Sequence, residues 1–128
     1  AGMLTAVRRA EKRKEWIVFF GWKPHPMNLQ IKMRYLTGSE DVFGPNEGQA
    51  TVSVVTTADY PQRCANVQRL LSNLHMDSAE VSAVMAPILE RTAPKDAARA
   101  WLKDNPQRLD AFLQGVTPRT GQPAALKL

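Results

Sequence analysis

Residues 16–28 read WIVFFGWKPHPMN, an apolar run that ends at a glycine and gives way to a proline-rich loop. The run Trp16–Phe20 has the length of a strand and is rich in aromatic and β-branched residues. Because it is apolar on both faces, it predicts a central strand of a covered, parallel sheet. Gly21 allows the chain to turn sharply where this strand ends. The preceding helical pattern, Met3 to Ala10, then predicts the second half of a βαβ unit whose first strand is missing.

The loop that follows the predicted strand carries Trp22 and His25. Pro24 and Pro26 fix their own φ and hold the residues before them in extended conformations, so the loop is stiff. Ligand sites of open α/β sheets lie beyond the carboxyl ends of the strands, which is where Trp22 stands. An indole face attracts cations, and quaternary ammonium ligands are commonly held this way. The pattern makes Trp22 and His25 candidate ligand contacts. A lone tryptophan near a strand end is more often a core residue, and His25 is equally consistent with a plain loop role.

The remaining sequence predicts several helices and two further extended segments, so the fold class is α/β. Helix start signals stand at Asp59, Asp77, Pro94 and Asn105, and the helix after Asp59 is expected to continue through Leu74. Pro87 is expected to kink or shorten its helix. Alternating residues 29–35 and the run 51–57 predict the extended segments, and residues 117–128 predict a loose tail. Trp16 and Trp101 fall within apolar patterns and are predicted to pack in the core.

The composition restricts the class of protein. The chain has 128 residues, a formal net charge of +5, one cysteine and two histidines far apart in the sequence. These counts predict a single small domain without an internal disulfide, a metal site or a cofactor. The longest apolar run is too short to cross a bilayer. No serine or cysteine lies in a recognisable nucleophile setting, so an enzyme is the least supported class.

The positive charge raises a nucleic-acid-binding alternative. Its candidate surface is the basic cluster Arg8, Arg9, Lys12, Arg13 and Lys14. The competing interpretation is a solvated helix face, because the remaining basic residues are spread along the whole chain. No recognition-helix pattern or aromatic-interleaved RNA motif is present. The sequence therefore predicts no nucleic-acid partner.

Two segments carry a resemblance to a known family: GWKPHPMN (21–28) and DVFGPN (41–46). Together with the helical segments from residue 3 to 117, they resemble the substrate-binding proteins of ABC importers for glycine betaine, choline and related compatible solutes. Proteins of this family have a type-two periplasmic-binding-protein-like fold, a two-lobed clamp. They hold the trimethylammonium group of the ligand in an aromatic box between the lobes.

The resemblance implies a site, partners and a domain division for this chain. Trp22 would be one wall of the box, and His25 would lie near the polar end of the ligand. The partners would be a quaternary ammonium solute and a membrane permease, in the periplasm. Residues 1–21 would end the second lobe, 22–116 would form the carboxyl-terminal part of the first lobe, and 117–128 the tail. The other box residues would lie outside this chain, which is expected to be a carboxyl-terminal portion that dimerises or swaps elements. The sequence does not distinguish choline, glycine betaine, proline betaine and carnitine.

Overall fold

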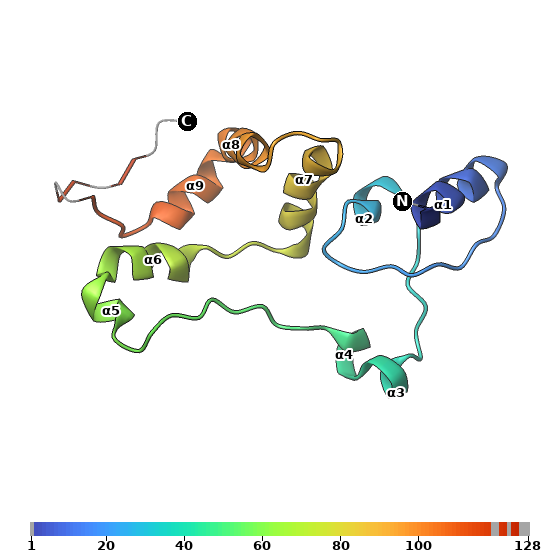
Figure 1. Cartoon of the computed structure of the whole chain (residues 1–128), viewed down its shortest axis with the longest axis horizontal. Helices are drawn as coiled ribbons and strands as arrows, with labels where there is room; N and C mark the ends of the chain where they lie inside the picture. The colour runs from blue at the N-terminus through green and yellow to red at the C-terminus, as the bar shows by residue number, and fades with distance from the viewer. Residues whose placement is uncertain (1, 119–120, 123, 126–128) are drawn as a thin grey trace.

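The structure is a computed structural model that describes residues 2–118, 121–122 and 124–125. Within these residues the regular elements are all helices, and no β-strand is formed (Figure 1). The helices are α1 (Gly2–Arg13), α2 (Met27–Gln30), α3 (Glu40–Phe43), α4 (Pro45–Gly48), α5 (Tyr60–Arg63), α6 (Ala65–Asn73), α7 (Ser78–Leu89), α8 (Pro94–Asp104) and α9 (Pro106–Leu113). The helical part of the predicted α/β fold is confirmed, whereas the predicted strands are wrong for this structure.

Local start signals place the carboxyl-terminal helices where the sequence predicts them. Asp77 caps α7 by accepting the backbone N–H groups of Ala79 and Glu80, both at 2.8 Å. The Glu80 carboxylate returns the interaction by accepting the N–H of Asp77 at 3.0 Å, which completes a capping box. Helices α8 and α9 begin at prolines, whose missing N–H is no loss in a first helical turn. Pro87 lies inside α7, which ends soon after it.

The helix predicted to run from Asp59 through Leu74 is interrupted. Cys64 adopts φ −135° and ψ 51°, which separates α5 from α6, and α6 ends at Asn73. Asp59 stands at the amino end of α5, but its carboxylate makes no capping hydrogen bond. Instead Asp59 Oδ2 lies 2.6 Å from Nε of Arg63, one turn along the chain. The carboxylate therefore stabilises α5 through an ion pair and not through a cap.

Helices α6 to α9 pack into a small bundle. Helix α7 contacts α8, α8 contacts α9, and α9 contacts α6 (Figure 1). Helix α2 also contacts α7. Ala97 and Phe112 are buried in this bundle, and Ser82 is buried with its hydroxyl donated to the carbonyl of Ser78 at 2.6 Å. Half-buried Trp101 lies on α8, so the predicted packing role of this residue fits the structure.

A second buried cluster joins the amino-terminal helix to the loop. Its buried members are Val7 of α1, Met27 of α2 and Ile31. Leu4, Phe19 and Met33 pack partly buried around them. This cluster unites residues on both sides of position 21, and it fixes α2 against α1.

The segments predicted as strands are unpaired, and in the predicted segment 29–35 residues Leu29 and Gln30 belong to α2 instead. Within the described residues, the backbone of 16–21 takes part in no hydrogen bond, and neither does the backbone of 50–56. Trp16 is 102% exposed and Val52 is 97% exposed, so the predicted packing of Trp16 is wrong. The physical reason is that a strand is stabilised by a neighbouring strand and a covering layer, and neither lies beside these segments. Figure 1 shows residues 50–58 running openly from α4 to α5.

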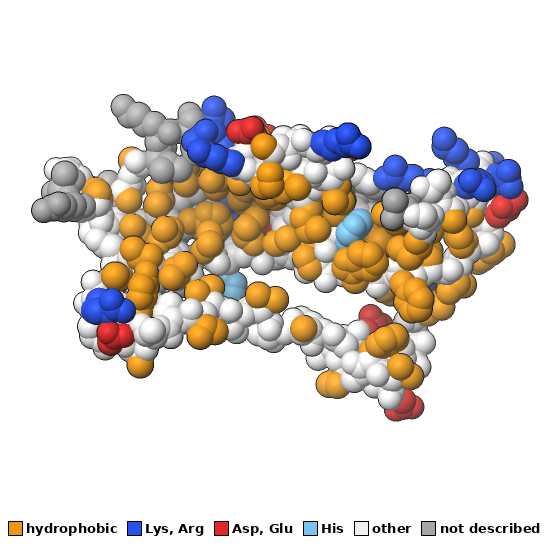
Figure 2. All heavy atoms as spheres, in the orientation of Figure 1, with side chains coloured by type: hydrophobic (Ala, Val, Ile, Leu, Met, Phe, Trp, Pro, Cys, Tyr) orange, Lys and Arg blue, Asp and Glu red, His pale blue; other side chains and the backbone are white. Residues whose placement is uncertain are grey.

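The open segments give the chain an unusually large surface. Its accessible area is 10537 Å². A compact monomer of 14.3 kDa exposes about 6,800 Å², so the chain exposes roughly 3,700 Å² more than its mass requires. Hydrophobic side chains spread across the visible face, and the Lys and Arg side chains gather mainly along its upper edge (Figure 2). This excess area is the main departure from a self-contained domain.

The predicted tail is partly fastened. Asn66 of α6 accepts the backbone N–H of Thr117 at 3.3 Å and its hydroxyl at 3.1 Å, so residue 117 belongs to the bundle. Residues 119–120, 123 and 126–128 of the predicted tail lie outside the described residues. Among the residues described, no helix is both long enough and apolar enough to cross a membrane.

Candidate ligand-binding loop

Trp22 and His25 lie side by side in the loop between the extended segment 16–21 and α2. Their ring centroids are 5.0 Å apart and the ring planes meet at 67°, an edge-to-face arrangement. The Trp22 side chain is 50% exposed, so much of the indole surface is open to solvent. The structure therefore brings together both residues that the sequence predicts as ligand contacts.

The carboxyl side of the loop is anchored in the core. Pro26 is buried, and Met27 is only 1% exposed in the cluster with Val7 and Ile31. Pro26 also accepts the backbone N–H of Leu29 at 2.9 Å, which closes the first turn of α2. The loop is thus held by a buried residue pair directly after His25.

The imidazole of His25 has a defined hydrogen-bond pattern. Its Nδ1 accepts the backbone N–H of Met27 at 3.1 Å. In the neutral ring the proton must then reside on Nε2, which donates no hydrogen bond within the described residues. In that tautomer Nε2–H is a hydrogen-bond donor without a partner among the described residues.

The side chain of Asn28 bonds the backbone of the loop, a role that the sequence did not predict. Its Nδ2 donates to the carbonyl of Trp22 and to the carbonyl of His25, both at 2.8 Å. Its Oδ1 accepts the hydroxyl of Tyr35 at 2.8 Å. The available signal was the asparagine that closes a proline-rich turn, a position where Asn side chains commonly bind loop backbone.

The Tyr35 ring packs next to the loop, against Gly21. A Cβ on Gly21 would lie 3.2 Å from Cε1 and from Oη of Tyr35, so the absence of a side chain at position 21 makes room for this ring. The Lys23 ammonium lies 5.1 Å from the ring centroid, a cation–π contact within the protein. Burial raises the pKa of the Tyr35 phenol above its ordinary value. The phenol therefore stays protonated near neutral pH and donates to Asn28.

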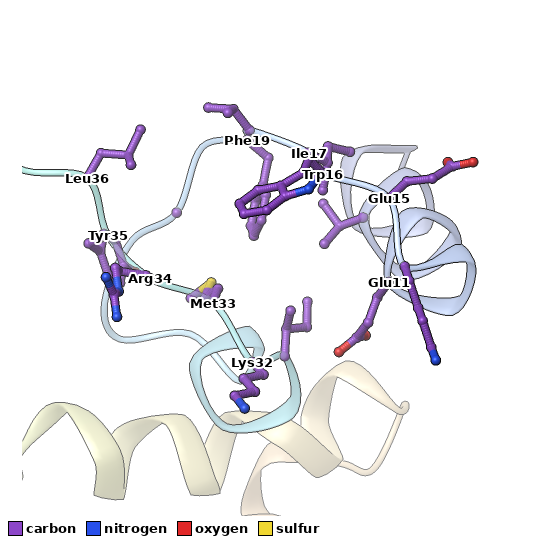
Figure 3. A pocket seen from close by; sticks show the side chains of 15 residues that line it. Glu11, Glu15, Trp16, Ile17, Phe19, Lys32, Met33, Arg34, Tyr35 and Leu36 are labelled. Carbon is purple, nitrogen blue, oxygen red and sulfur yellow. The ribbon is translucent and has the colours of Figure 1, made fainter.

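A hollow lies next to this loop. It measures about 600 Å³ and runs between α1 and the extended segments 16–21 and 31–36. Figure 3 shows Trp16 and Phe19 on one side of it and Met33 on the other. Gly21 and Tyr35 border both the hollow and the loop, whereas Trp22 and His25 lie outside the hollow. The candidate ligand contacts therefore form an open surface at its edge.

The chemistry that this loop offers is binding. It presents an exposed aromatic face, one imidazole N–H group and a fixed backbone. In the part of the chain that the structure describes, no three His, Cys, Asp or Glu residues are grouped closely enough to hold a metal ion. An aromatic face with an adjacent donor fits a cation that also carries an oxygen atom.

Comparisons with known proteins point in the same direction. Residues 1–104 match the family model described as the substrate binding domain of ABC-type glycine betaine transport systems. The glycine betaine/carnitine transport binding protein GbuC of Listeria monocytogenes serotype 1/2a is 26% identical over 116 residues, which is 91% of this chain and 38% of that protein.

Two solved structures are also similar. One is an ABC-transporter choline binding protein in complex with choline, 48% identical with a TM-score of 0.70, matched over 95% of this chain and 43% of that one. The other is an ABC-transporter choline binding protein in an unliganded semi-closed conformation, 49% identical with a TM-score of 0.63, matched over 94% and 42%. The chain spans about two fifths of the length of these relatives.

Proposed function

We propose that this chain supplies one aromatic wall, Trp22, of a binding site for a quaternary ammonium ligand. The chain belongs to the family of substrate-binding domains of ABC-type glycine betaine transport systems. Family membership confirms the resemblance seen in the sequence. It also confirms the expected class, a transport binding protein and not an enzyme. The nucleic-acid alternative gains nothing from the structure, since the basic side chains of α1 are simply exposed on a helix face.

The observation that carries the proposal is the open indole on a fastened loop. Trp22 is half exposed, and its carbonyl is held by Asn28. A ring that is already fixed loses little conformational entropy when a ligand binds to it. A desolvated cation–π contact contributes roughly 2 kcal/mol of binding free energy. One ring is therefore only part of a binding site, and a complete site needs several rings.

His25 would bind the oxygen-bearing end of the same ligand. Its Nε2–H donor stands next to the indole, at a ring separation of 5.0 Å. The hydroxyl of choline and the carboxylate of glycine betaine can both accept such a bond. The choline complex of the 48%-identical relative makes choline the first ligand to test.

The architecture that follows from this proposal is a two-lobed, type-two periplasmic-binding-protein-like clamp. Residues 1–21 would belong to the end of the second lobe, 22–116 to the first lobe, and 117–128 to a terminal tail. The TM-score of 0.70 to the choline-bound relative supports this assignment. The loaded protein would deliver its ligand to a membrane permease from the extracytoplasmic side, as expected of a binding protein of an ABC importer.

The test uses a chimaera in which this chain replaces the matched 43% of the choline-binding relative. The chimaera is needed because one aromatic wall alone should bind choline weakly or not at all. Calorimetry should give a choline affinity about 30-fold lower for Trp22→Leu than for the parent, while Trp22→Phe keeps most of the affinity. Trp22→Leu keeps an apolar side chain but removes the aromatic face, and Trp22→Phe keeps an aromatic face.

An uncharged carbon analogue of choline serves as the ligand control, because it should bind the parent and Trp22→Leu with similar affinity. Equal choline affinity in the parent and in Trp22→Leu would show that Trp22 is a packing residue. A loss in Trp22→Phe as large as in Trp22→Leu would also contradict the cation–π assignment.

The chain by itself should associate through its unpaired segments. Its excess exposed area of roughly 3,700 Å² is far larger than the approximately 800 Å² that each partner buries in a standard interface. Residues 16–21 also present unpaired backbone donors and acceptors between apolar side chains. We infer that two copies pair along this segment or exchange it, since both arrangements satisfy the backbone and cover Trp16.

A further inference from the structure

Asn28 uses every hydrogen-bonding group of its side chain within or beside the ligand-binding loop. Both Nδ2 protons go to carbonyls, one of Trp22 and one of His25, and Oδ1 receives the hydroxyl of Tyr35. The backbone N–H of Asn28 donates to the His25 carbonyl as well, at 3.0 Å. The two carbonyls belong to the two residues whose rings form the candidate site.

The prolines of the loop leave Trp22 unconstrained. Pro24 restricts the backbone of Lys23, and Pro26 restricts that of His25, because each proline acts on the residue immediately before it. Trp22 does not precede a proline. In the described structure the bond from Asn28 is the one hydrogen bond made by the Trp22 backbone. The orientation of the peptide group after Trp22 therefore depends on the Asn28 amide.

The two loop carbonyls set which way that amide faces, because a carbonyl can only accept and Nδ2 is the only donor of the amide. Oδ1 then faces Tyr35, whose hydroxyl donates to it at 2.8 Å. The Tyr35 ring is itself held between Gly21, where no side chain intervenes, and the Lys23 ammonium. The Tyr35 hydroxyl thus donates to Asn28, and Asn28 in turn donates to the Trp22 carbonyl.

We propose that Asn28 is the positioning residue of the site, and that its amide holds Trp22 and His25 in the edge-to-face arrangement that receives a quaternary ammonium ligand. The inference rests on the proposed function of Trp22 and His25. Asn28 acts through these two residues, because its polar groups are all used within the protein. Loss of its donors leaves the indole in place on the chain but free to take other orientations, so the site loses its preorganisation.

The test compares two asparagines that make the same kind of contact. Asn28→Asp keeps the shape and the acceptor oxygen and removes both donors. Asn73→Asp is the matched control, since Asn73 Nδ2 also donates to two carbonyls, those of Phe112 at 3.0 Å and Gln114 at 2.8 Å, away from the loop. In the chimaera, Asn28→Asp should lower choline affinity about tenfold, and Asn73→Asp should leave it unchanged.

A spectroscopic readout in the 128-residue chain separates positioning from general stability. At a ring separation of 5.0 Å the indole of Trp22 should shift the ring-proton NMR signals of His25, and nuclear Overhauser contacts should join the two rings. Asn28→Asp should abolish both signs of contact while the amide signals of α6–α9 stay in place. Asn28→Ser, which retains one donor, should give an intermediate affinity and an intermediate ring shift.

The outcomes separate this inference from the proposed function. If Asn28→Asp preserves the ring contact, Asn28 does not position the rings and the inference fails. It also fails if the ring contact is lost while choline affinity is unchanged in a chimaera that Trp22→Leu weakens. If Trp22→Leu has no effect on affinity, the proposed site itself is wrong, whatever the result at Asn28. If Asn28→Asp does not fold, Asn28→Ser decides by the same two readouts.

Discussion

Arg108 joins the last helix of the bundle to the beginning of α7, and its removal should destabilise the bundle measurably. Its Nε lies 2.7 Å from Oε1 of Glu80, at an angle that gives an ion pair without a hydrogen bond. Its Nη2 donates to Oε2 of Glu80 at 3.2 Å and also to the carbonyl of His75. The guanidinium lies 5.1 Å from the ring centroid of Phe112. One side chain therefore contacts the loop before α7, its capping box and the core of α9.

The expected magnitude follows from the partial burial of the pair. The side chains of Arg108 and Glu80 are 32% and 21% exposed. Fully exposed pairs contribute about 0.2–1 kcal/mol, and hydrogen bonds to charged groups in the interior contribute roughly 1.5–3 kcal/mol. The coupling between the two residues should lie between these limits, at about 1–2 kcal/mol. Arg108→Met should cost about 2 kcal/mol in total, because the His75 carbonyl also loses its partner.

A double-mutant cycle with Arg108→Met and Glu80→Gln isolates the coupling. Glutamine at position 80 can still accept the N–H of Asp77, so the capping box is retained. Urea unfolding followed by circular dichroism gives the four free energies, and Arg108→Met should lower Tm by about 8 °C. Arg99→Met on the exposed face of α8 is the control and should shift Tm by less than about 1 °C. A coupling energy below about 0.5 kcal/mol would refute the assignment of Arg108 as the tie between α7 and α9.

Two further expectations concern the open part of the chain. Sedimentation of the 128-residue chain should show a dimer that Val18→Pro weakens, because proline removes a backbone donor from segment 16–21; a monomer at every concentration would contradict the association. The pKa of Asp59 is lowered, first by the hydrogen bond to Thr57 and then by the hydrogen bond to Arg63. The ionised Asp59 carboxylate therefore contributes to stability above its unfolded-state pKa, and this contribution is lost as pH falls through its folded-state pKa. NMR titration should show that Thr57→Val and Arg63→Gln each raise this pKa, and an unchanged pKa in both variants would be inconsistent with the structure.

The helices were predictable because their signals are local. The capping box at Asp77 and the prolines that open α8 and α9 act within one helical turn, so the sequence alone contains them. The break at Cys64 was missed for the opposite reason. Apolar residues continue at helical spacing through this position, and no glycine or proline marks the unusual backbone angles there.

The strands could not be predicted with the same success, because a strand is a relation between segments. The composition of Trp16–Phe20 favours a strand, but the structure forms no strand there. Pairing depends on a neighbour that the segment itself does not specify. Trp16 illustrates the consequence, since its apolar surroundings in the sequence predict burial whereas the side chain is fully exposed.

The sequence drew attention to Trp22 and His25, the candidate ligand contacts, and missed the residues that support them. Trp22 and His25 stand out because aromatic and imidazole groups on a proline-rich loop have few purely local uses. Asn28 and Tyr35 are separated by seven positions, and their contact appears only when α2 folds the chain back. Sequence patterns identify side chains with distinctive chemistry, whereas hydrogen-bonded supports depend on geometry that the pattern does not contain.

The candidate ligand-binding loop lies between a packed part of the chain and a segment without hydrogen-bonded neighbours. On its carboxyl side, Pro26 and Met27 are buried and Asn28 reaches back to Trp22. On its amino side, residues 16–21 have no hydrogen-bonded neighbour in the described structure. Whatever pairs with segment 16–21 also restricts Gly21 and Trp22, and so removes conformational freedom that ligand binding would otherwise have to remove. Because such coupling is reciprocal, the proposed binding of a quaternary ammonium ligand at Trp22 should in turn strengthen the pairing of this segment.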